Sequence, residues 1–258
     1  RISEIKAAGA VVCGSLTPQS VQQHYEVAVE AGLDILVIQG TVISAEHVST
    51  TVEPLNLKEF ISEVPIPTVV GGCASYSTGL HLMRTGAVGV LVGVGPGAAC
   101  TTRGVLGIGV PQATAIADVA AARSQHMLET GEYVNVIGDG GMRTGGDISK
   151  AIACGADAVM IGSPLARAKE APGRGYHWGM ATFHSSLPRG TRVTTVQDGT
   201  MEEILLGPAH TNDGTFNLMG ALRTSMATCG YEDIRSFQRA EMMIAPALMT
   251  EGKKLQQE

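Results

Sequence analysis

The sequence predicts an α/β fold, a TIM (β/α)8 barrel, and three observations support this prediction. Six short apolar runs occur along the chain, and each is followed by a helical stretch. The runs are almost continuously apolar, as in parallel strands that are buried on both faces. Strand–helix alternation implies right-handed crossovers, which build either a doubly wound sheet or a barrel. A weak internal repeat favours the barrel. The predicted strands are residues 11–15, 34–39, 68–71, 89–94, 134–139 and 158–161.

The repeat consists of three segments that each run from a helix end through a glycine into a strand. These segments are residues 30–37, 84–91 and 153–160. A barrel is built from eight strand–helix units, and the pattern stops near residue 170. We therefore expect strands three to eight in this chain and the first two units before residue 1. We also expect a fragment whose first residues lie inside a helix.

Helix boundaries are predicted from prolines and polar residues at the starts and from glycines at the ends. One helix should run from Thr17-Pro18 to Gly32, a long one from Pro111 to about Gly131, and a third from Thr144 or Gly145 to Gly155.

The C-terminal part is expected to complete one catalytic barrel domain that spans residues 1–258. The region of about 173–207 is rich in Gly, Pro, Thr and Arg and lacks periodicity. A connection of this length is usually a functional flap or lid, or a disordered segment. Residues 218–229 are apolar at helical spacing, so we expect closing helices within about 217–258.

Composition excludes several classes of protein. The net charge is −6 and no basic run occurs, which argues against nucleic-acid binding. No apolar stretch approaches the roughly 20 residues that span a bilayer. The five cysteines form no CxxC pair, which indicates reduced thiols and a cytoplasmic enzyme. No set of His, Cys and Glu has the spacing of a transition-metal site.

The most informative residue is Cys100, which lies in a glycine-rich loop directly after the apolar run 89–94. Glycines allow the backbone to turn sharply and to approach a ligand closely. The loop follows the carboxyl end of a predicted strand, where barrel enzymes carry their catalytic groups. A buried filler cysteine is the alternative, but a filler does not require glycines before it and Thr-Thr-Arg after it.

Two further loops, at residues 137–146 and 159–163, follow the last two predicted strands. Barrels commonly hold a phosphate there through backbone N–H groups and helix N-termini. We expect Gly140, Gly141, Gly162 and Ser163 to approach phosphate oxygens, and Asp139 to accept hydrogen bonds from a ribose diol. The alternative is that these glycines only serve tight turns between strand and helix.

These motifs resemble the IMP dehydrogenase family and its sister, GMP reductase. The resemblance covers nearly the whole chain and is closest to short bacterial members without regulatory CBS domains. It rests on GVGPGAACTTRGVLGIGVPQ at 93–112, DGGMRTGGD at 139–147, ADAVMIGS at 156–163, GM at 179–180 and NLMGALRTSM at 217–226.

The resemblance implies a role for each of these segments. Cys100 would be the nucleophile that adds to C2 of the purine. Hydride would then pass from C2 to NAD, and water would cleave the thioimidate. Arg103 and the loop amides are candidates to stabilise the thiolate, and Thr102 could bond the sulfur or guide the water. The implied ligand sets are Gly93, Val94 and Gly95 for the nicotinamide, carbonyls of Gly95, Gly97 and Cys100 for K⁺, Asp139, Gly140, Gly141, Gly162 and Ser163 for the ribose phosphate, and Gly179 and Met180 for the hypoxanthine.

Some residues depart from the family's pattern. Gln39 stands where an Asp contacts the cofactor ribose, Cys73 where an Asn is usual, and Ala98 where a phosphate-binding Ser is usual. The flap of the family carries an Arg-Tyr pair whose Arg activates water, and no such dipeptide follows Met180. Arg189 is our first choice as its substitute. Other candidates are Arg192, His184 and Tyr176. Trp178 could either stack on a base or pack the lid.

The sequence thus predicts NAD-dependent oxidation of IMP to XMP, with Cys100, Thr102 and Arg189 as catalytic residues and Gln39 among the cofactor-binding residues. Two alternatives stay open. One is NADPH-dependent GMP reduction, and the other is a nucleotide-binding regulator that has lost turnover. The resemblance further implies a homotetramer or octamer.

Overall fold

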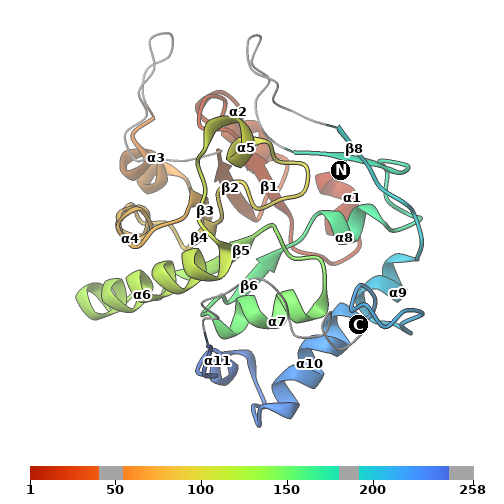
Figure 1. The fold of residues 1–258 in the computed structure, drawn as a ribbon. Coiled ribbons are helices and arrows are strands. Elements are labelled where there is room, and N and C mark those ends of the chain that lie inside the picture. The colour runs from red at the N-terminus through yellow and green to blue at the C-terminus, as the bar shows by residue number, and fades with distance from the viewer. Residues whose placement is uncertain (41–54, 180–191, 244–258) are drawn as a thin grey trace.

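The computed structural model of the chain describes residues 1–40, 55–179 and 192–243. Its centre is a sheet of six parallel strands that neighbour one another in chain order. The sheet is curled, and helices cover its outer side (Figure 1). The strands are β1 (Cys13–Leu16), β2 (Ile35–Gln39), β3 (Thr68–Cys73), β4 (Gly89–Val92), β5 (Asn135–Asp139) and β6 (Ala158–Met160). All six predicted strands are confirmed. The curled parallel sheet is consistent with part of a TIM-like barrel, and numbering these strands three to eight stays a prediction.

The described helices are α1 (Ile2–Ala7), α2 (Val21–Glu30), α3 (Leu57–Glu63), α4 (Tyr76–Met83), α5 (Thr102–Leu106), α6 (Gln112–Thr130), α7 (Gly145–Ala153), α8 (Ser163–Ala166), α9 (Met201–Leu205), α10 (Leu218–Thr228) and α11 (Ile234–Phe237). The predicted bounds of α6 and α7 are confirmed to within two residues. The predicted start of α2 was wrong. Residues 18–20 form a turn, in which the Thr17 hydroxyl lies 2.9 Å from that of Ser20, and the helix begins only at Val21.

The two faces of the sheet pack differently because side chains alternate along each strand. The outer side chains join the helices in the main core, and the inner ones form a small cluster on the concave face. Outer positions include Leu36, Ile38, Val70, Val90 and Val136, and the inner cluster contains Val37, Val69 and Leu91 with Ile35 and Ile137 at its margin. Apolar side chains therefore fill the concave face on the amino-terminal side of the strands' carboxyl ends.

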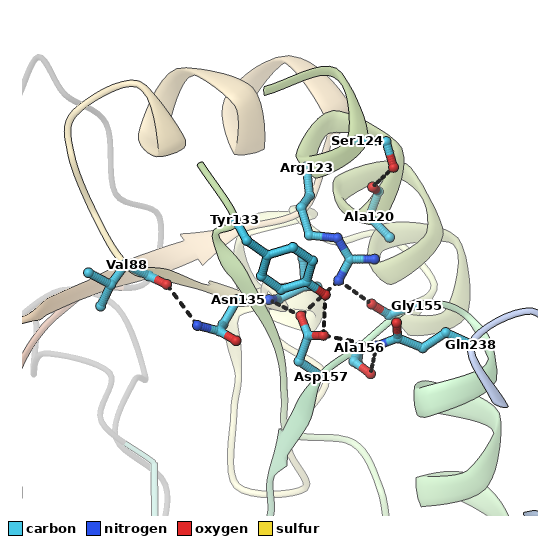
Figure 2. A network of polar contacts seen from close by, with 11 residues as sticks. Val88, Ala120, Arg123, Ser124, Tyr133, Asn135, Gly155, Ala156, Asp157 and Gln238 are labelled. Atoms are coloured by element: carbon cyan, nitrogen blue, oxygen red, sulfur yellow. Dashed lines mark hydrogen bonds and ion pairs between the residues drawn. The ribbon is translucent and has the colours of Figure 1, made fainter. Parts of the chain in front are cut away.

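The internal repeat has a structural counterpart at the amino ends of the strands. Asp34 stands before β2 and accepts a hydrogen bond from the backbone N–H of Val12, at 2.8 Å. Asp157 stands before β6 and accepts the equivalent bond from Val136, also at 2.8 Å. Figure 2 shows that Asp157 gathers more partners, which are Arg123, Tyr133 and Gln238. The aspartate of two of the three repeat segments thus ties β2 to the start of β1 and β6 to β5.

The region predicted as a flap contains regular structure in its described part. Strands β7 (Tyr176–Trp178) and β8 (Arg192–Thr194) pair in antiparallel fashion and form a small separate sheet. Arg192 lies over the ring of Tyr176, with its guanidinium carbon 3.9 Å from the ring centroid. Alternation over three residues is too short to show as periodicity, which explains why the sequence did not indicate these strands.

The closing helix expected at 218–229 is confirmed as α10, which packs on α7. The Ser149 hydroxyl of α7 lies 3.1 Å from the Ser225 hydroxyl of α10. The rest of the closing segment, residues 244–258, lies outside the described residues. None of the helices in the described part of the chain has the length and apolar character that crossing a membrane requires.

Candidate active site

Polar side chains gather at the carboxyl ends of the strands, above the inner apolar cluster. Val37 and Ile137 belong to that cluster, and two residues further along β2 and β5 stand Gln39 and Asp139. Because side chains alternate, both lie on the concave face. The Gln39 Nε2 donates a hydrogen bond to the Asp139 Oδ2 at 2.8 Å. This is the end of a parallel barrel where catalytic groups are found, so we take it as the candidate site.

The Cys100 loop joins β4 to α5 at this same end. The backbone N–H of Cys100 donates to the Gly97 carbonyl at 3.0 Å, which closes a tight turn. The Cys100 Sγ lies 3.2 Å from the Oγ1 of Thr102, whose residue is fully buried. The thiol itself belongs to a partly exposed residue. The Cys100 thiol thus donates a hydrogen bond to the Thr102 hydroxyl oxygen, which is the contact between the two residues that the sequence suggested.

Arg103 fixes the loop rather than contacting the thiol. Its Nε donates to the carbonyl of Val94 at 3.1 Å, and its Nη2 donates to the carbonyl of Val110. These bonds connect the two ends of the segment around α5. The idea that Arg103 stabilises the thiolate therefore needs correction, because the hydrogen-bond partner of the sulfur is Thr102.

The loop after β5 packs directly against the Cys100 loop. Gly140 and Gly141 have φ angles of 78° and 84°, a region that favours glycine. A Cβ added to Gly141 would lie only 2.9 Å from the Cβ of Pro96, and one added to Gly140 would lie 3.6 Å from the nitrogen of Gly97. Two of the three glycine-rich loops named by the sequence are therefore in contact.

The small sheet brings further residues to the same place. A Cβ added to Gly179 would lie 3.2 Å from the carbonyl oxygen of Ala99 and 3.8 Å from the nitrogen of Cys100. Gly179 therefore borders the thiol loop, and its role in binding hypoxanthine stays a prediction. Met180, its predicted companion, and Arg189, the predicted water activator, lie outside the described residues, as does His184.

A chain of three polar side chains connects the loop after β6 to the small sheet. The Ser163 Oγ lies 3.3 Å from the Nε2 of His177 on β7, and the Nδ1 of His177 lies 2.8 Å from the Oγ1 of Thr195. A Cβ added to Gly162 would meet nothing within 4 Å, so the backbone there is open. His177 was not recognised from the sequence, although it directly precedes Trp178-Gly179. Trp178 is largely exposed.

Gln112, at the start of α6, is a second residue that the sequence analysis missed. Its Nε2 donates to the carbonyl of Val92 at 2.6 Å and reaches the carbonyl of Asp139 at 3.4 Å. It thereby ties the ends of β4 and β5 together. A Cβ at Gly93 would overlap this same Asp139 carbonyl and crowd the Gln112 amide. Gly93 is consequently a glycine because the two strand ends meet there.

Burial dominates the electrostatics of the site. Burial raises the pKa of Asp139, and the hydrogen bond from Gln39 acts in the opposite direction. Burial also raises the pKa of Cys73 to about 12. Cys73, which stands where an Asn is usual, packs in the main core and donates to the Leu91 carbonyl at 3.5 Å. Cys13 and Cys229 are exposed.

No group of three or more His, Cys, Asp and Glu side chains within residues 1–40, 55–179 and 192–243 could hold a metal ion. Backbone carbonyls are the ligands that the Cys100 loop itself offers a cation. Gly97 offers one, although its carbonyl already accepts the Cys100 N–H.

Comparison with known proteins agrees with these features. The family model described as the IMP dehydrogenase / GMP reductase domain matches residues 4–254. An uncharacterized oxidoreductase from Mycolicibacterium smegmatis is 49% identical over 247 residues, which cover 94% of this chain and 66% of that protein. An inosine-5′-monophosphate dehydrogenase from Methanocaldococcus jannaschii is 34% identical over 245 residues, which cover 81% of this chain and 46% of that protein.

Two crystal structures have the same fold. An IMP dehydrogenase/GMP reductase-like protein from Corynebacterium glutamicum superposes with a TM-score of 0.87 at 47% identity, covering 95% of this chain and 64% of that one. A GMP reductase from Trypanosoma brucei in complex with guanosine 5′-monophosphate gives a TM-score of 0.73 at 30% identity, covering 89% and 48%. The chain thus spans between about half and two thirds of the length of these relatives.

Proposed function

The chain belongs to the IMP dehydrogenase/GMP reductase family, and we propose that it carries the active site for NAD-dependent oxidation of IMP to XMP through Cys100. One observation carries the proposal. The Cys100 loop, the loop after β5 and Gly179 lie against one another at the carboxyl ends of the strands. A reactive thiol, a carboxylate and open glycine backbone are thereby assembled around a single place.

The groups around this place match the parts of a purine nucleotide. The backbone of Gly140, Gly141 and Gly162 would bind phosphate oxygens together with the Ser163 hydroxyl. His177 adds an imidazole beside that hydroxyl. Asp139 would accept hydrogen bonds from the ribose hydroxyls. Gly179 and Met180 would border the base, with C2 toward Cys100.

Cys100 would act as a nucleophile. Its thiolate electron pair forms a bond to C2 of the purine, which becomes tetrahedral and can release its hydrogen with both electrons. The Thr102 hydroxyl, 3.2 Å from the sulfur, would donate to the thiolate and stabilise it. Water then adds to C2, the carbon–sulfur bond breaks, and the sulfur leaves as thiolate while XMP is released. We propose Arg189 as the residue that activates this water.

The residues present fit both of the implied small partners. NAD, when bound, accepts the hydride that leaves C2. Gly93, Val94 and Gly95 would hold its nicotinamide through backbone groups only, because Val94 is buried and a Cβ at either glycine would meet protein atoms. The neutral carbonyls of Gly95, Gly97 and Cys100 suit a monovalent cation such as K⁺, which needs no carboxylate ligand. We also propose a homotetramer or octamer.

GMP reduction with NADPH is the second candidate function. Its support is the fold shared with the Trypanosoma brucei GMP reductase and the lack of an Arg-Tyr dipeptide after Met180. A nucleotide-binding regulator is the third, and it would bind IMP without turnover.

The deciding experiment measures absorbance of the reduced nicotinamide with the full-length protein. One arm contains IMP, NAD and K⁺, and the other contains GMP and NADPH. We expect NADH to form in the first arm. NADPH consumption in the second arm alone would establish the reductase, and IMP binding by calorimetry without either change would establish the regulator.

The nucleophile is tested separately with 6-chloropurine ribotide, which forms a thiol adduct. Mass spectrometry should locate the adduct on Cys100 in the wild type and find none in Cys100→Ala. An adduct that persists in the variant would relocate the nucleophile.

A further inference from the structure

We propose that Gln39 is a positioning residue for the nucleotide, because its side-chain amide holds the Asp139 carboxylate in place. The inference rests on the proposed function above and adds to it. It differs from the cofactor-binding role that the family pattern suggests for position 39, because it assigns Gln39 to the nucleotide half of the site.

The geometry of the contact is unusual for two strand residues. Strands β3 and β4 lie between β2 and β5 in the sheet. The 2.8 Å bond from the Gln39 Nε2 to the Asp139 Oδ2 therefore reaches across the concave face rather than along a strand pair. It joins residues 100 positions apart in the chain. Such a bond fixes the direction of the carboxylate within the mouth of the sheet.

The amide can meet the carboxylate in one orientation only. A carboxylate accepts hydrogen bonds and an NH₂ group donates them, so the Nε2 must face Asp139. The opposite end of the amide, Oε1, lies 3.5 Å from the hydroxyl of Ser15 on β1, a weak contact at the limit of hydrogen-bond length. Within the described residues, Asp139 accepts this one side-chain bond on Oδ2. Its Oδ1 is left for the ribose.

The amide also acts on the charge of Asp139. Burial raises the pKa of this carboxyl, and the hydrogen bond from Gln39 acts in the opposite direction. The charged and ionisable groups of the neighbouring loop bond elsewhere. The Arg103 guanidinium binds the carbonyls of Val94 and Val110, and the Cys100 thiol lies against Thr102. Gln39 is thus the described group that opposes the effect of burial on the pKa of Asp139.

A carboxylate at position 39 would have the opposite effect. Two carboxylates within hydrogen-bond distance repel each other when both are ionised, and they can approach only by sharing a proton. A leucine, by contrast, would leave Asp139 buried without its donor. We therefore expect the loss of IMP affinity to change with pH in opposite directions in Gln39→Leu and Gln39→Glu. A purely structural role for Gln39 would not give opposite pH dependences.

The experiment measures IMP binding by calorimetry, without NAD, in Gln39→Leu and Gln39→Glu. The control is Gln125→Leu, which removes an amide from the exposed face of α6. Gln39→Leu should weaken IMP binding about tenfold, the loss expected for one hydrogen bond to a charged group. The loss should grow as the pH falls toward the raised pKa of Asp139. In Gln39→Glu the loss should shrink as the pH falls, because the two carboxyls then share a proton. The control should bind as the wild type does.

Two further readouts complete the test. The KM for NAD should stay within about twofold in Gln39→Leu, since that contact is not to the cofactor. Carbon-13 NMR of the free protein should show Asp139 titrating at higher pH in Gln39→Leu. If Gln39→Leu had a raised KM for NAD and unchanged IMP affinity, the inference would be overturned. Gln39 would then be a cofactor-binding residue. Wild-type protein that binds neither IMP nor GMP would overturn the proposed function as well, whereas wild-type binding with unaltered Gln39→Leu affinity would overturn only the role of Gln39.

Discussion

Replacement of Asp157 with asparagine should destabilise the fold by about 3 kcal/mol. The carboxylate accepts hydrogen bonds from Arg123 at 2.8 Å, Tyr133 at 2.6 Å, Val136 at 2.8 Å and Gln238 at 2.9 Å (Figure 2). The Arg123 and Asp157 side chains are only 11% and 17% exposed. Water therefore cannot readily solvate the Arg123 guanidinium once the negative charge of Asp157 is removed.

The magnitude follows from what asparagine retains. Its single oxygen can serve two of the four donors. If that oxygen keeps the Arg123 and Val136 bonds, the NH₂ group faces the Nε2 of Gln238, which cannot accept a hydrogen bond from it. Removing one partner of a buried ion pair costs roughly 3–5 kcal/mol, and the slight exposure here favours the lower end. For a domain of this size, each kcal/mol lowers the Tm by about 2–4 °C, so the expected shift is about 6–12 °C.

Urea and thermal unfolding of the wild type, Asp157→Asn and Asp34→Asn measure this effect. Asp34 makes the same backbone bond to the preceding strand, but its ion pair with Lys6 is exposed, at 44% and 37% for the two side chains. Asp34→Asn should therefore shift the Tm clearly less. A loss below about 1 kcal/mol in Asp157→Asn, or equal shifts in the two variants, would refute the claim that burial gives this network its strength.

Three further predictions concern the loops and the cysteines. Gly141→Ala should raise the KM for the nucleotide about tenfold, because alanine is strained at a φ of 84° and its Cβ would press on the proline of the Cys100 loop. The matched control Gly104→Ala, where a Cβ meets nothing within 4 Å, should leave KM unchanged. Hydrogen bonds from two threonines lower the pKa of Asp213 to about 2, so its contribution to stability is complete above its ordinary pKa and is lost as the pH falls toward 2. Urea unfolding should therefore lose less stability over that range in Asp213→Asn than in the wild type, and equal losses would contradict this assignment. Iodoacetamide should label the exposed Cys229 but spare Cys73, whose pKa burial raises to about 12, until urea unfolds the chain. Labelling of both at equal rates in the native protein would show that Cys73 is not buried.

The sequence alone predicted the six parallel strands and most of the boundaries of the few helices for which it gave bounds, because these features depend on local signals. Continuous apolar runs mark parallel strands that are buried on both faces. Thr144 and Gly131 each determine a helix end through their own conformation or side chain, a capping box in the first case and a left-handed φ in the second. Local signals failed where they are short or ambiguous. The three-residue strands β7 and β8 exist because they pair with each other, and neither carries enough alternation to be recognised alone.

The sequence also determined which loops carry the candidate chemistry, since glycines beside Cys100 and Asp139 are visible in the chain. Only the tertiary structure determined which partners these residues have. Sequence spacing suggested Arg103 as the partner of the thiol, but in the folded chain its guanidinium donates hydrogen bonds to the carbonyls of Val94 and Val110. Gln39 and His177 found their partners 100 and 14 residues away. Hydrogen bonds between side chains depend on distances across the curled sheet, and the order of residues along one chain does not contain those distances.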